Sequence, residues 1–156
     1  MVASVYIEKL KKYCAYQERS HQEVRDKAYK LGLYKSEVEN AIIQLIEDDY
    51  LNEERFAQAY VSGKFRIKRW GRVKIKQNLK MKQISDYCIK KGMQEIDEEE
   101  YIETLNYWIE RRKKTTAKAE NLFELKGKIA NFVMQKGFES SLVWEMLNSD
   151  EELKQK

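Results

Sequence analysis

The stretch that decides the fold spans residues 20–42 and has the sequence SHQEVRDKAYKLGLYKSEVENAI. Ser20 and Glu23 have the spacing of a capping box, in which each side chain accepts a backbone N–H at the start of a helix. Ser36 opens a second such box, so a second helix should begin there. Gly32 lies between the two starts and can adopt the left-handed conformation that ends a helix, at a cost of roughly 1 kcal/mol or more for other side chains. The stretch predicts two short helices joined near Gly32.

Five apolar positions of this stretch recur twice more along the chain, which indicates internal repeats. In each set, the first and second positions lie 9 and 5 residues before the third position, and the fourth and fifth lie 5 and 9 residues after it. The second set lies 51 residues after the first, and the third set lies a further 54 residues on. The three sets are Val24, Ala28, Leu33, Val38 and Ile42; Ile75, Leu79, Ile84, Ile89 and Met93; and Ile129, Val133, Phe138, Val143 and Leu147. Because all fifteen positions are apolar, we predict three homologous units.

Capping residues and apolar periodicity divide each unit into three helices. Asn52 and Ser85 are further N-cap candidates, and Gly137 is the counterpart of Gly32 in the third unit. The expected helices span residues 4–18, 20–31, 36–47, 53–68, 71–82, 85–93, 97–118, 122–136 and 140–148. They form a first repeat at 1–50, a basic second repeat at 51–95 and a third repeat at 96–156. Since each helix has an apolar stripe and a charged back, we predict an all-α fold of three tandem three-helix repeats in an elongated, curved molecule.

The composition argues against an enzyme and against a membrane protein. Cys14 and Cys88 stand singly, without a CxxC motif or a His at metal-ligand spacing, and are expected to be buried free thiols. His21 is the only histidine, and no partner base or nucleophile motif accompanies it. We therefore expect no catalytic residue, no metal and no cofactor. With no apolar run near the roughly 18 residues of a membrane span and no signal peptide, we expect a cytoplasmic protein that does not enter a membrane.

Positive charge is concentrated in the middle unit, because no acidic residue occurs between Phe56 and Ser85. Acidic blocks flank this basic stretch on both sides. Its nine like charges repel one another unless an anionic partner or the flanking acids offset them. The candidate contact residues of the basic stretch are Lys64, Arg66, Lys68, Arg69, Trp70, Arg72, Lys74, Lys76, Lys80 and Lys82. We expect this stretch to meet phosphate or an acidic protein surface.

Other interpretations of this stretch remain open. A charge run can simply be the solvated face of helices. Trp70 can pack into its own repeat, or it can stack on a base or dock a partner. Two helices joined near Gly32 have the outline of a helix-turn-helix motif, but the second of them carries glutamates that would repel DNA phosphates. Only the middle unit remains a candidate for that motif.

Three sequence blocks resemble signatures of the RecX family. Tyr50-Leu51-Asn52-Glu53-Glu54-Arg55-Phe56-Ala57 is similar to the block in which a Tyr-Leu pair and an acidic turn precede an Arg-Phe-Ala triplet. Trp70-Gly71-Arg72-Val73-Lys74-Ile75, followed by Leu79, Lys82 and Ile84, resembles the second signature, and Arg19-Ser20 with Glu23, Lys27, Leu31 and Gly32 resembles the opening block. The similarity spans the whole chain and is weak in the third unit. Gln83 departs from it, since the family usually has Gly there, so it either adopts the left-handed conformation or ends the helix differently.

The resemblance implies a non-enzymatic regulator that lies in the groove of the RecA–DNA filament. Such a protein contacts adjacent protomers and inhibits ATP hydrolysis, filament extension and strand exchange in DNA repair, recombination and the SOS response. The implied partners are the RecA filament and single-stranded DNA, and the chain itself is expected to be a monomer. Arg55 is expected to pair with nearby carboxylates instead of a partner. Two alternatives are a RecA-independent nucleic-acid-binding module and a helical scaffold that bridges other proteins, which titrations against single-stranded DNA with and without RecA distinguish.

Overall fold

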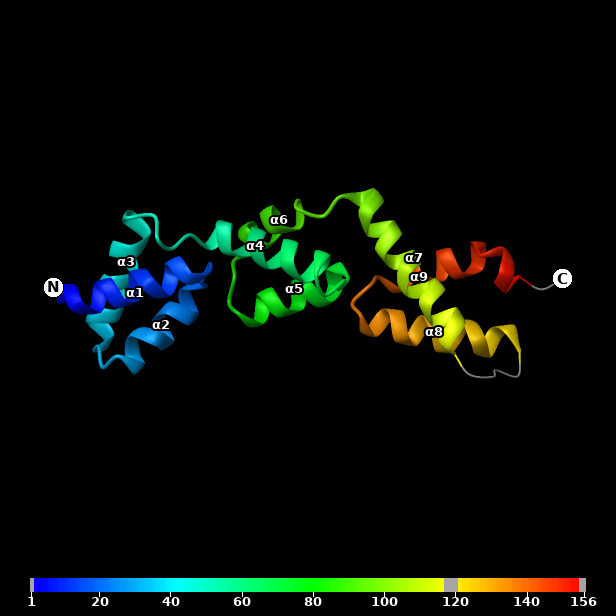
Figure 1. The fold of residues 1–156 in the computed structure, drawn as a ribbon, viewed down its shortest axis with the longest axis horizontal. Helices are drawn as coiled ribbons and strands as arrows, with labels where there is room; N and C mark the ends of the chain where they lie inside the picture. The colour runs from blue at the N-terminus through cyan, green and yellow to red at the C-terminus, as the bar shows by residue number, and fades with distance from the viewer. Residues whose placement is uncertain (1, 117–120, 155–156) are drawn as a thin grey trace. The chain divides into compact units, whose positions relative to one another are not determined.

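The protein is all-helical in the part that the computed structural model describes, residues 2–116 and 121–154. The helices are α1 (Ser4–Tyr16), α2 (His21–Lys30), α3 (Lys35–Glu47), α4 (Glu53–Arg66), α5 (Arg72–Met81), α6 (Asp86–Met93), α7 (Glu98–Thr115), α8 (Leu122–Gln135) and α9 (Ser140–Ser149), followed by a 3-10 turn, η1 (Glu151–Leu153). Figure 1 shows them in chain order, with α1, α2 and α3 packed as one triplet and α7, α8 and α9 as another. The all-α prediction is confirmed.

The predicted helix bounds agree with the structure to within two residues, except at the end of α7, which is predicted at 118 and observed at Thr115. The helix expected at 97–118 has its last two predicted residues, 117 and 118, outside the described part of the chain. The η1 turn was not predicted. The accuracy at the helix starts follows from capping side chains, because a cap satisfies backbone N–H groups that have no partner inside the helix.

Three of the four predicted caps form as expected. Ser20 Oγ accepts the Glu23 N–H at 3.1 Å, and the Glu23 carboxylate accepts the Ser20 N–H at 3.2 Å, which completes the capping box. Asn52 caps α4 and Ser85 caps α6 through their side-chain oxygens. The cap predicted at Ser36 is wrong, because α3 begins one residue earlier. The Glu37 carboxylate accepts the N–H of the extended residue Tyr34 at 3.0 Å, which places Ser36 in the first turn.

The helix ends at three equivalent positions all adopt the left-handed conformation. Gly32 has φ 98° and Gly137 has φ 102°, as the sequence predicts for glycines that end helices. Gln83 occupies the same position in the middle unit and has φ 63°. The left-handed alternative for Gln83 is therefore the one observed, although this conformation costs a non-glycine residue roughly 1–2 kcal/mol. The turn geometry is thus kept in all three sequence repeats.

The apolar columns of the repeat form the cores. All of their side chains are buried except Met93, which is half-buried. By its contacts the chain divides into two compact units, which do not coincide with the three sequence repeats. The first unit is residues 1–60 with 79–92, and the second unit is residues 61–78 with 93–156. In the first unit, α1, α2 and α3 enclose a core that includes Leu10, Val24, Val38 and Leu45. In the second unit, the rings of Phe65 and Phe138 contact the buried ring of Tyr101, with centroid distances of 5.9 and 5.0 Å.

Cys14 and Cys88 are buried free thiols, which confirms the prediction for them. None of the helices in the described ranges has the length and apolar character needed to cross a membrane. Within those same ranges, His, Cys, Asp and Glu side chains form no group that could hold a metal ion.

Cys14 makes the stability of the first unit sensitive to alkaline pH. Burial raises the pKa of its thiol from 9.0 to about 11. In the unfolded chain the thiol ionises near its ordinary pKa, so above pH 9 the unfolded state holds fewer protons than the folded state, and stability falls as pH rises toward 11. We expect this thiol to contribute a slope of up to about 1.4 kcal/mol per pH unit in that window. Urea unfolding of wild type and Cys14→Ala at pH 8, 9, 10 and 11 measures it, and equal slopes for the two proteins would refute the assignment.

Candidate partner-binding surface

The basic stretch occupies the end of α4, the turn after it and most of α5. The turn is closed by the backbone, because the Trp70 N–H donates to the Lys64 carbonyl at 3.1 Å and Arg69 adopts the left-handed conformation with φ 56°. Five of the candidate residues are exposed, namely Arg66, Lys68, Arg69, Lys76 and Lys80. The other five are half-buried, namely Lys64, Trp70, Arg72, Lys74 and Lys82. The stretch therefore contains both exposed cations and cations that pack against the protein.

The candidates do not all belong to one compact unit. Lys80 and Lys82 lie in the first unit, where the Lys82 ammonium is 5.8 Å from the centre of the Tyr60 ring. The other eight lie in the second unit. In that second unit, four exposed cations lie within residues 66–76, namely Arg66, Lys68, Arg69 and Lys76.

Trp70 carries cations on its ring. The ammonium of Lys74 is 4.3 Å from the ring centre and that of Lys64 is 5.0 Å away. Cation–π contacts of this kind hold flexible side chains in place at a gain of about 0.5–1 kcal/mol when exposed. Trp70 is half-buried, so part of its ring packs within its own unit while the ammonium groups of Lys64 and Lys74 lie beside it. The two open interpretations of Trp70, packing and contact, are therefore compatible.

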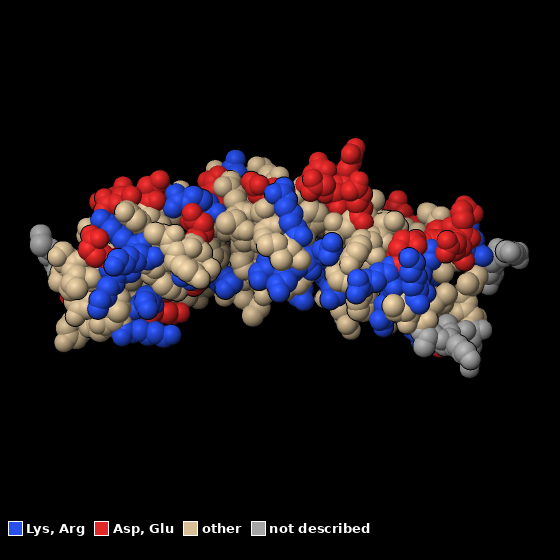
Figure 2. All heavy atoms as spheres, viewed as in Figure 1, with Lys and Arg blue, Asp and Glu red and all other residues tan. Residues whose placement is uncertain are grey.

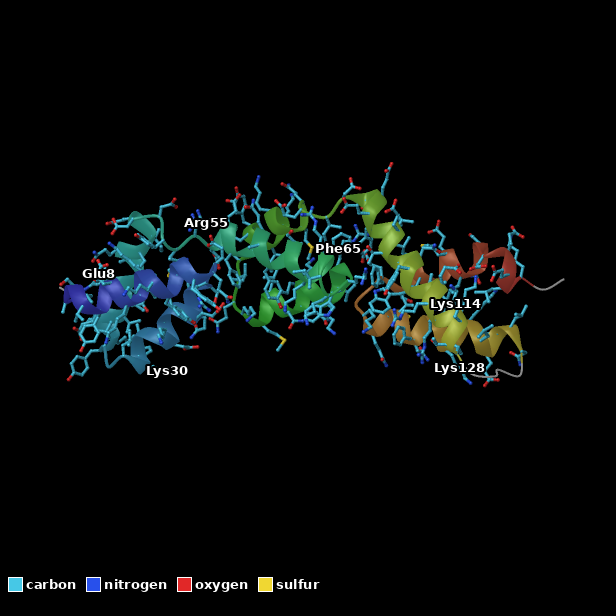
Figure 3. All side chains as sticks on the ribbon, in the orientation of Figure 1. Glu8, Lys30, Arg55, Phe65, Lys114 and Lys128 are labelled. Atoms are coloured by element: carbon cyan, nitrogen blue, oxygen red, sulfur yellow. The ribbon has the colours of Figure 1, made fainter. Side chains whose placement is uncertain are left out.

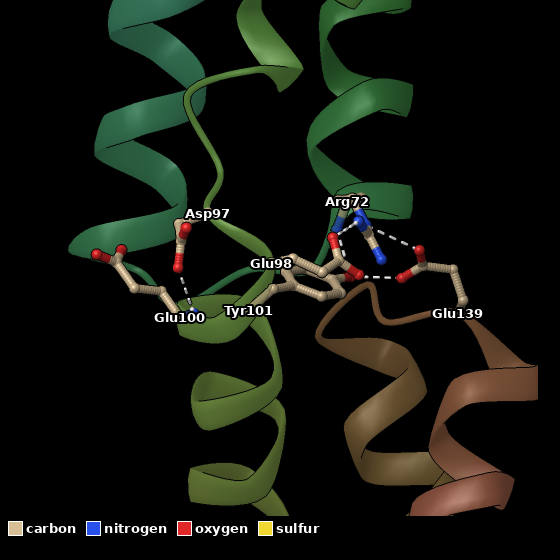
Figure 4. Close-up of polar contacts among 6 residues, drawn as sticks. All are labelled: Arg72, Asp97, Glu98, Glu100, Tyr101 and Glu139. Carbon is tan, nitrogen blue, oxygen red and sulfur yellow. Dashed lines mark hydrogen bonds and ion pairs between the residues drawn. The ribbon is translucent and has the colours of Figure 1, made fainter.

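Arg72 is held in a network within the second unit (Figure 4). Its Nε donates to Glu139 at 2.8 Å, and its Nη1 donates to Glu98 at 3.0 Å. The guanidinium lies 3.9 Å from the centre of the Tyr101 ring. The Tyr101 hydroxyl accepts the backbone N–H of Arg72 at 2.9 Å and donates to Glu139. Arg72 thus joins the start of α5 to α7 and to the turn before α9.

The charges around Arg72 hold its guanidinium within its own chain. Burial alone would lower the pKa of Arg72, but the attraction of Glu139 and its neighbours outweighs it and raises the pKa. Burial, reinforced by the hydrogen bond to Glu139, raises the pKa of Tyr101. Because both ion-pair partners of Arg72 come from its own chain, we assign it a structural role and remove it from the proposed contact set.

Gly71 allows a close backbone contact beside this network. The Gly71 N–H donates to the Lys136 carbonyl and the Val73 N–H donates to the Gly137 carbonyl, both at 2.8 Å. A Cβ atom added at Gly71 would lie 2.3 Å from the carbonyl carbon and oxygen of Gly137. Only glycine therefore permits the turn between α8 and α9 to approach this near. Together with the Tyr101 hydroxyl, the contact occupies the N–H groups of Gly71, Arg72 and Val73 at the start of α5.

Arg55 has the structural role that the sequence suggests. Its Nε donates to Glu18 at 2.5 Å and its Nη1 to Asp49 at 3.1 Å, within the first unit. Figure 3 labels Arg55 at the start of α4. The hydrogen bond to Glu18 raises the pKa of Arg55 more than burial lowers it. Arg55 therefore ties the segment between α1 and α2 to α4.

The third repeat adds cations that the sequence analysis did not single out. The Arg112 guanidinium lies 4.4 Å from the centre of the Phe132 ring, and Arg69 of the basic stretch lies 4.2 Å from the centre of the Tyr107 ring in this repeat. The Lys136 ammonium is 4.7 Å from the Trp108 ring. The sequence does contain a signal, since Tyr107-Trp108 is followed by the run Arg111-Arg112-Lys113-Lys114. Figure 2 shows acidic side chains over the start of α7, and Lys and Arg side chains over its other end.

The described residues thus form an all-helical protein with a surface of exposed and ring-stacked cations. Two family models match it, the second three-helix domain of RecX at residues 52–93 and the third three-helix domain of RecX at residues 98–147. Together they cover more than half of the 156 residues. The chain belongs to the RecX family.

Relatives and solved structures agree with this assignment. The chain is 28% identical over 131 residues to the regulatory protein RecX of Bacillus cereus (strain B4264), which covers 84% of this chain and 48% of that protein. It is 29% identical over 133 residues to regulatory protein RecX of Halalkalibacterium halodurans, which covers 85% of this chain and 50% of that protein. The chain therefore spans about half the length of the curated relatives it matches.

Solved structures show the same fold. The crystal structure of RecX from Lactobacillus salivarius matches with a TM-score of 0.80 at 23% identity, covering 92% of this chain and 93% of that one. A second crystal structure of regulatory protein RecX matches with a TM-score of 0.82 at 20% identity, covering 94% of this chain and 73% of that one. At these identities the likeness concerns the fold alone.

Proposed function

We propose that this chain regulates RecA recombinase without catalysing a reaction. It binds the RecA–DNA filament and inhibits ATP hydrolysis, filament extension and strand exchange. Membership of the RecX family supports the regulatory role, since the relatives carry the name regulatory protein. The observation that carries the proposal is the set of exposed cations in the second unit, Arg66, Lys68, Arg69 and Lys76.

Electrostatics explains why these cations suit a filament. DNA is a dense polyanion, and cations that neutralise its phosphates release condensed counterions, which favours binding. Protein surfaces of complementary charge also accelerate association. The partly buried Arg72 is already neutralised by Glu98 and Glu139, whereas Arg66, Lys68 and Lys76 project into solvent. These three side chains, together with the exposed Arg69 that packs on the Tyr107 ring, are therefore the ones that a partner can reach.

The direct test is the ATPase activity of RecA on single-stranded DNA, with this chain added below the RecA concentration. We expect strong inhibition at that ratio, because a regulator of a filament affects many protomers from a few bound sites. Strand exchange by the same mixtures should fall in parallel. Full ATPase activity in the presence of equimolar folded protein would contradict the proposed function.

Charge reversal locates the contact. We expect Arg66→Glu, Lys68→Glu and Lys76→Glu combined to raise the protein concentration needed for half-inhibition by about tenfold or more, because like charges placed at an interface cost several kcal/mol. The matched control reverses Lys9, Lys12 and Lys30, which are exposed on α1 and α2 and change the net charge equally. Helicity by circular dichroism should be unchanged in both. Equal loss of inhibition in the control, or none in the test variant, would exclude the basic stretch as the specific contact.

A further inference from the structure

A groove lies between α7 and α8 of the second unit. Its lining residues are Arg112, Thr116, Lys128, Asn131, Phe132 and Gln135, and its volume is about 400 Å³. α7 and α8 pack directly on each other, and Figure 3 labels Lys114 on α7 and Lys128 on α8. Helical spacing explains most of the lining, because Arg112 lies in the last turn of α7, Thr116 follows directly after that helix, and Lys128, Asn131 and Gln135 follow one face of α8. The opposite face of α8 buries Ile129, Ala130 and Val133 in the core.

The lining consists of hydrogen-bond donors. It combines a guanidinium, an ammonium, two carboxamides and a hydroxyl around one aromatic ring, and none of the six side chains is acidic. Carboxamides and hydroxyls also accept hydrogen bonds, but the charged members only donate. A ligand that fits this set is an anion with several acceptor oxygens.

Arg112 is the most informative member. Its Nε atom is buried and has no hydrogen-bond partner among residues 2–116 and 121–154. Its guanidinium packs on the face of Phe132 at 4.4 Å, which fixes the plane of the group. A buried donor without a partner costs about 1–3 kcal/mol, and more for a charged group, so its presence in the fold calls for an explanation.

Two neighbouring cations on the same helices form ion pairs with acidic side chains of this chain. Lys113 is bound to Glu110 at 3.1 Å, and to Asp150 and Glu152 at 2.9 Å. Lys128 is 3.3 Å from Glu124. Arg112 is adjacent in sequence to Lys113, yet in the described part of the chain its charge meets the Phe132 ring. The contrast marks Arg112 as the cation of this groove that has no acidic partner among the described residues.

We infer that the groove between α7 and α8 binds a backbone phosphate of single-stranded nucleic acid, with Arg112 as the principal contact. The phosphate would receive hydrogen bonds from the guanidinium and from the side chains of Asn131 and Gln135. This inference goes beyond the proposed function, which places the contact on the basic stretch, and it does not depend on RecA. The third repeat thereby gains a role of its own.

Stacked cation–aromatic pairs favour nucleic acid over an acidic protein as the ligand. Lys136 lies 5.3 Å from the Phe132 ring and 4.7 Å from the Trp108 ring, next to the groove. The same unit carries Arg69 on Tyr107 and Lys74 on Trp70. Surfaces that bind single strands combine a positively charged path for phosphates with aromatic rings for bases. A single acidic side chain of a protein would require the cation but not the rings beside it.

The test uses the full chain and fluorescein-labelled oligothymidylate, without RecA, in anisotropy titrations at several salt concentrations. Wild type is expected to bind, with an affinity that falls linearly in a log–log salt plot. Arg112→Gln should weaken binding by about tenfold and reduce the salt slope by about 0.7, the value for one lost phosphate contact on a single strand. Arg112→Lys should recover the slope, because it restores the charge.

Controls separate the groove from general charge and from folding. Lys154→Gln also removes one positive charge from the second unit, but at an exposed pair with Glu151, and should leave affinity and slope unchanged. Thermal unfolding of each variant should match wild type. Absence of oligothymidylate binding by wild type, or an unchanged slope in folded Arg112→Gln, would overturn the inference. If Arg112→Gln leaves the slope of the salt plot unchanged but loses RecA inhibition, the groove binds a protein ligand instead. If Arg112→Gln reduces that slope and keeps RecA inhibition, the groove is supported independently of the proposed function.

Discussion

Gly71→Ala is expected to lower the free energy of unfolding of the second unit by about 3 kcal/mol. The added Cβ would lie 2.3 Å from the carbonyl carbon and oxygen of Gly137 and 2.5 Å from the Phe138 nitrogen. These are backbone atoms, so no side-chain rotation relieves the clash. Separation of the two segments would break the 2.8 Å hydrogen bonds from Gly71 to Lys136 and from Val73 to Gly137, and would leave buried groups unpaired.

Two other glycines provide matched controls for Gly71. Gly32 has no atom within 4 Å of an added Cβ but has φ 98°, so Gly32→Ala should cost only the left-handed strain of roughly 1–2 kcal/mol. Gly127 lies inside α8 with free space around it, so Gly127→Ala should increase stability by roughly 0.5–1 kcal/mol. Urea unfolding followed by circular dichroism measures all three. If Gly71→Ala proved as stable as wild type, the close backbone contact would not exist.

Ile75→Ala is expected to cost about 2–5 kcal/mol of unfolding free energy, as for other buried large-to-small substitutions. Ile75 is fully buried and belongs to the first apolar column of the middle unit. Its removal leaves a cavity beneath the basic stretch, so RecA inhibition should fall together with stability. Phe56→Ala should act similarly, because Phe56 is only 5% exposed.

Val73→Ala is the matched control on the same helix. Val73 is two residues from Ile75 and 39% exposed, so truncation should change stability by no more than about 0.5 kcal/mol. A comparison of the two denaturation midpoints tests the burial pattern directly. Comparable losses from Val73→Ala and Ile75→Ala would contradict the assignment of Ile75 to the core.

The positions of the helices could be predicted because their causes are local. The capping box of Ser20 and Glu23 acts over three residues, and the apolar columns repeat with helical spacing, so both are visible without a structure. The one cap that was misplaced, at Ser36, failed through a local competition: Glu37 was free to accept the N–H of Tyr34, which started α3 a residue earlier. The assignment of the three repeats as domains at 1–50, 51–95 and 96–156 stays a prediction.

The candidate site was harder to predict, because charge in the sequence does not show which charges are paired. Arg72 stands among exposed cations in the sequence, but Glu139, which pairs with it, is 67 residues away. The third repeat matches the third three-helix domain of RecX at residues 98–147, although the family signatures visible in the sequence lie in the first two repeats and do not include Arg112. The available signal was the adjacency of Tyr107-Trp108 to a run of four cations. Whether a cation in such a run is paired depends on contacts between helices.

The sequence by itself determined that the chain is helical, where nearly all its helices begin and end, which side chains form the cores, and that a basic stretch lies between acidic blocks. These properties follow from interactions within a few residues or from apolar periodicity. Only the tertiary structure decided that Arg72 is neutralised within the chain, that Gly71 is required by the backbone of Gly137, and that the Nε of Arg112 has no partner in the part of the chain that the structure describes. Each of these depends on distances between segments far apart in the chain, which residue order does not specify.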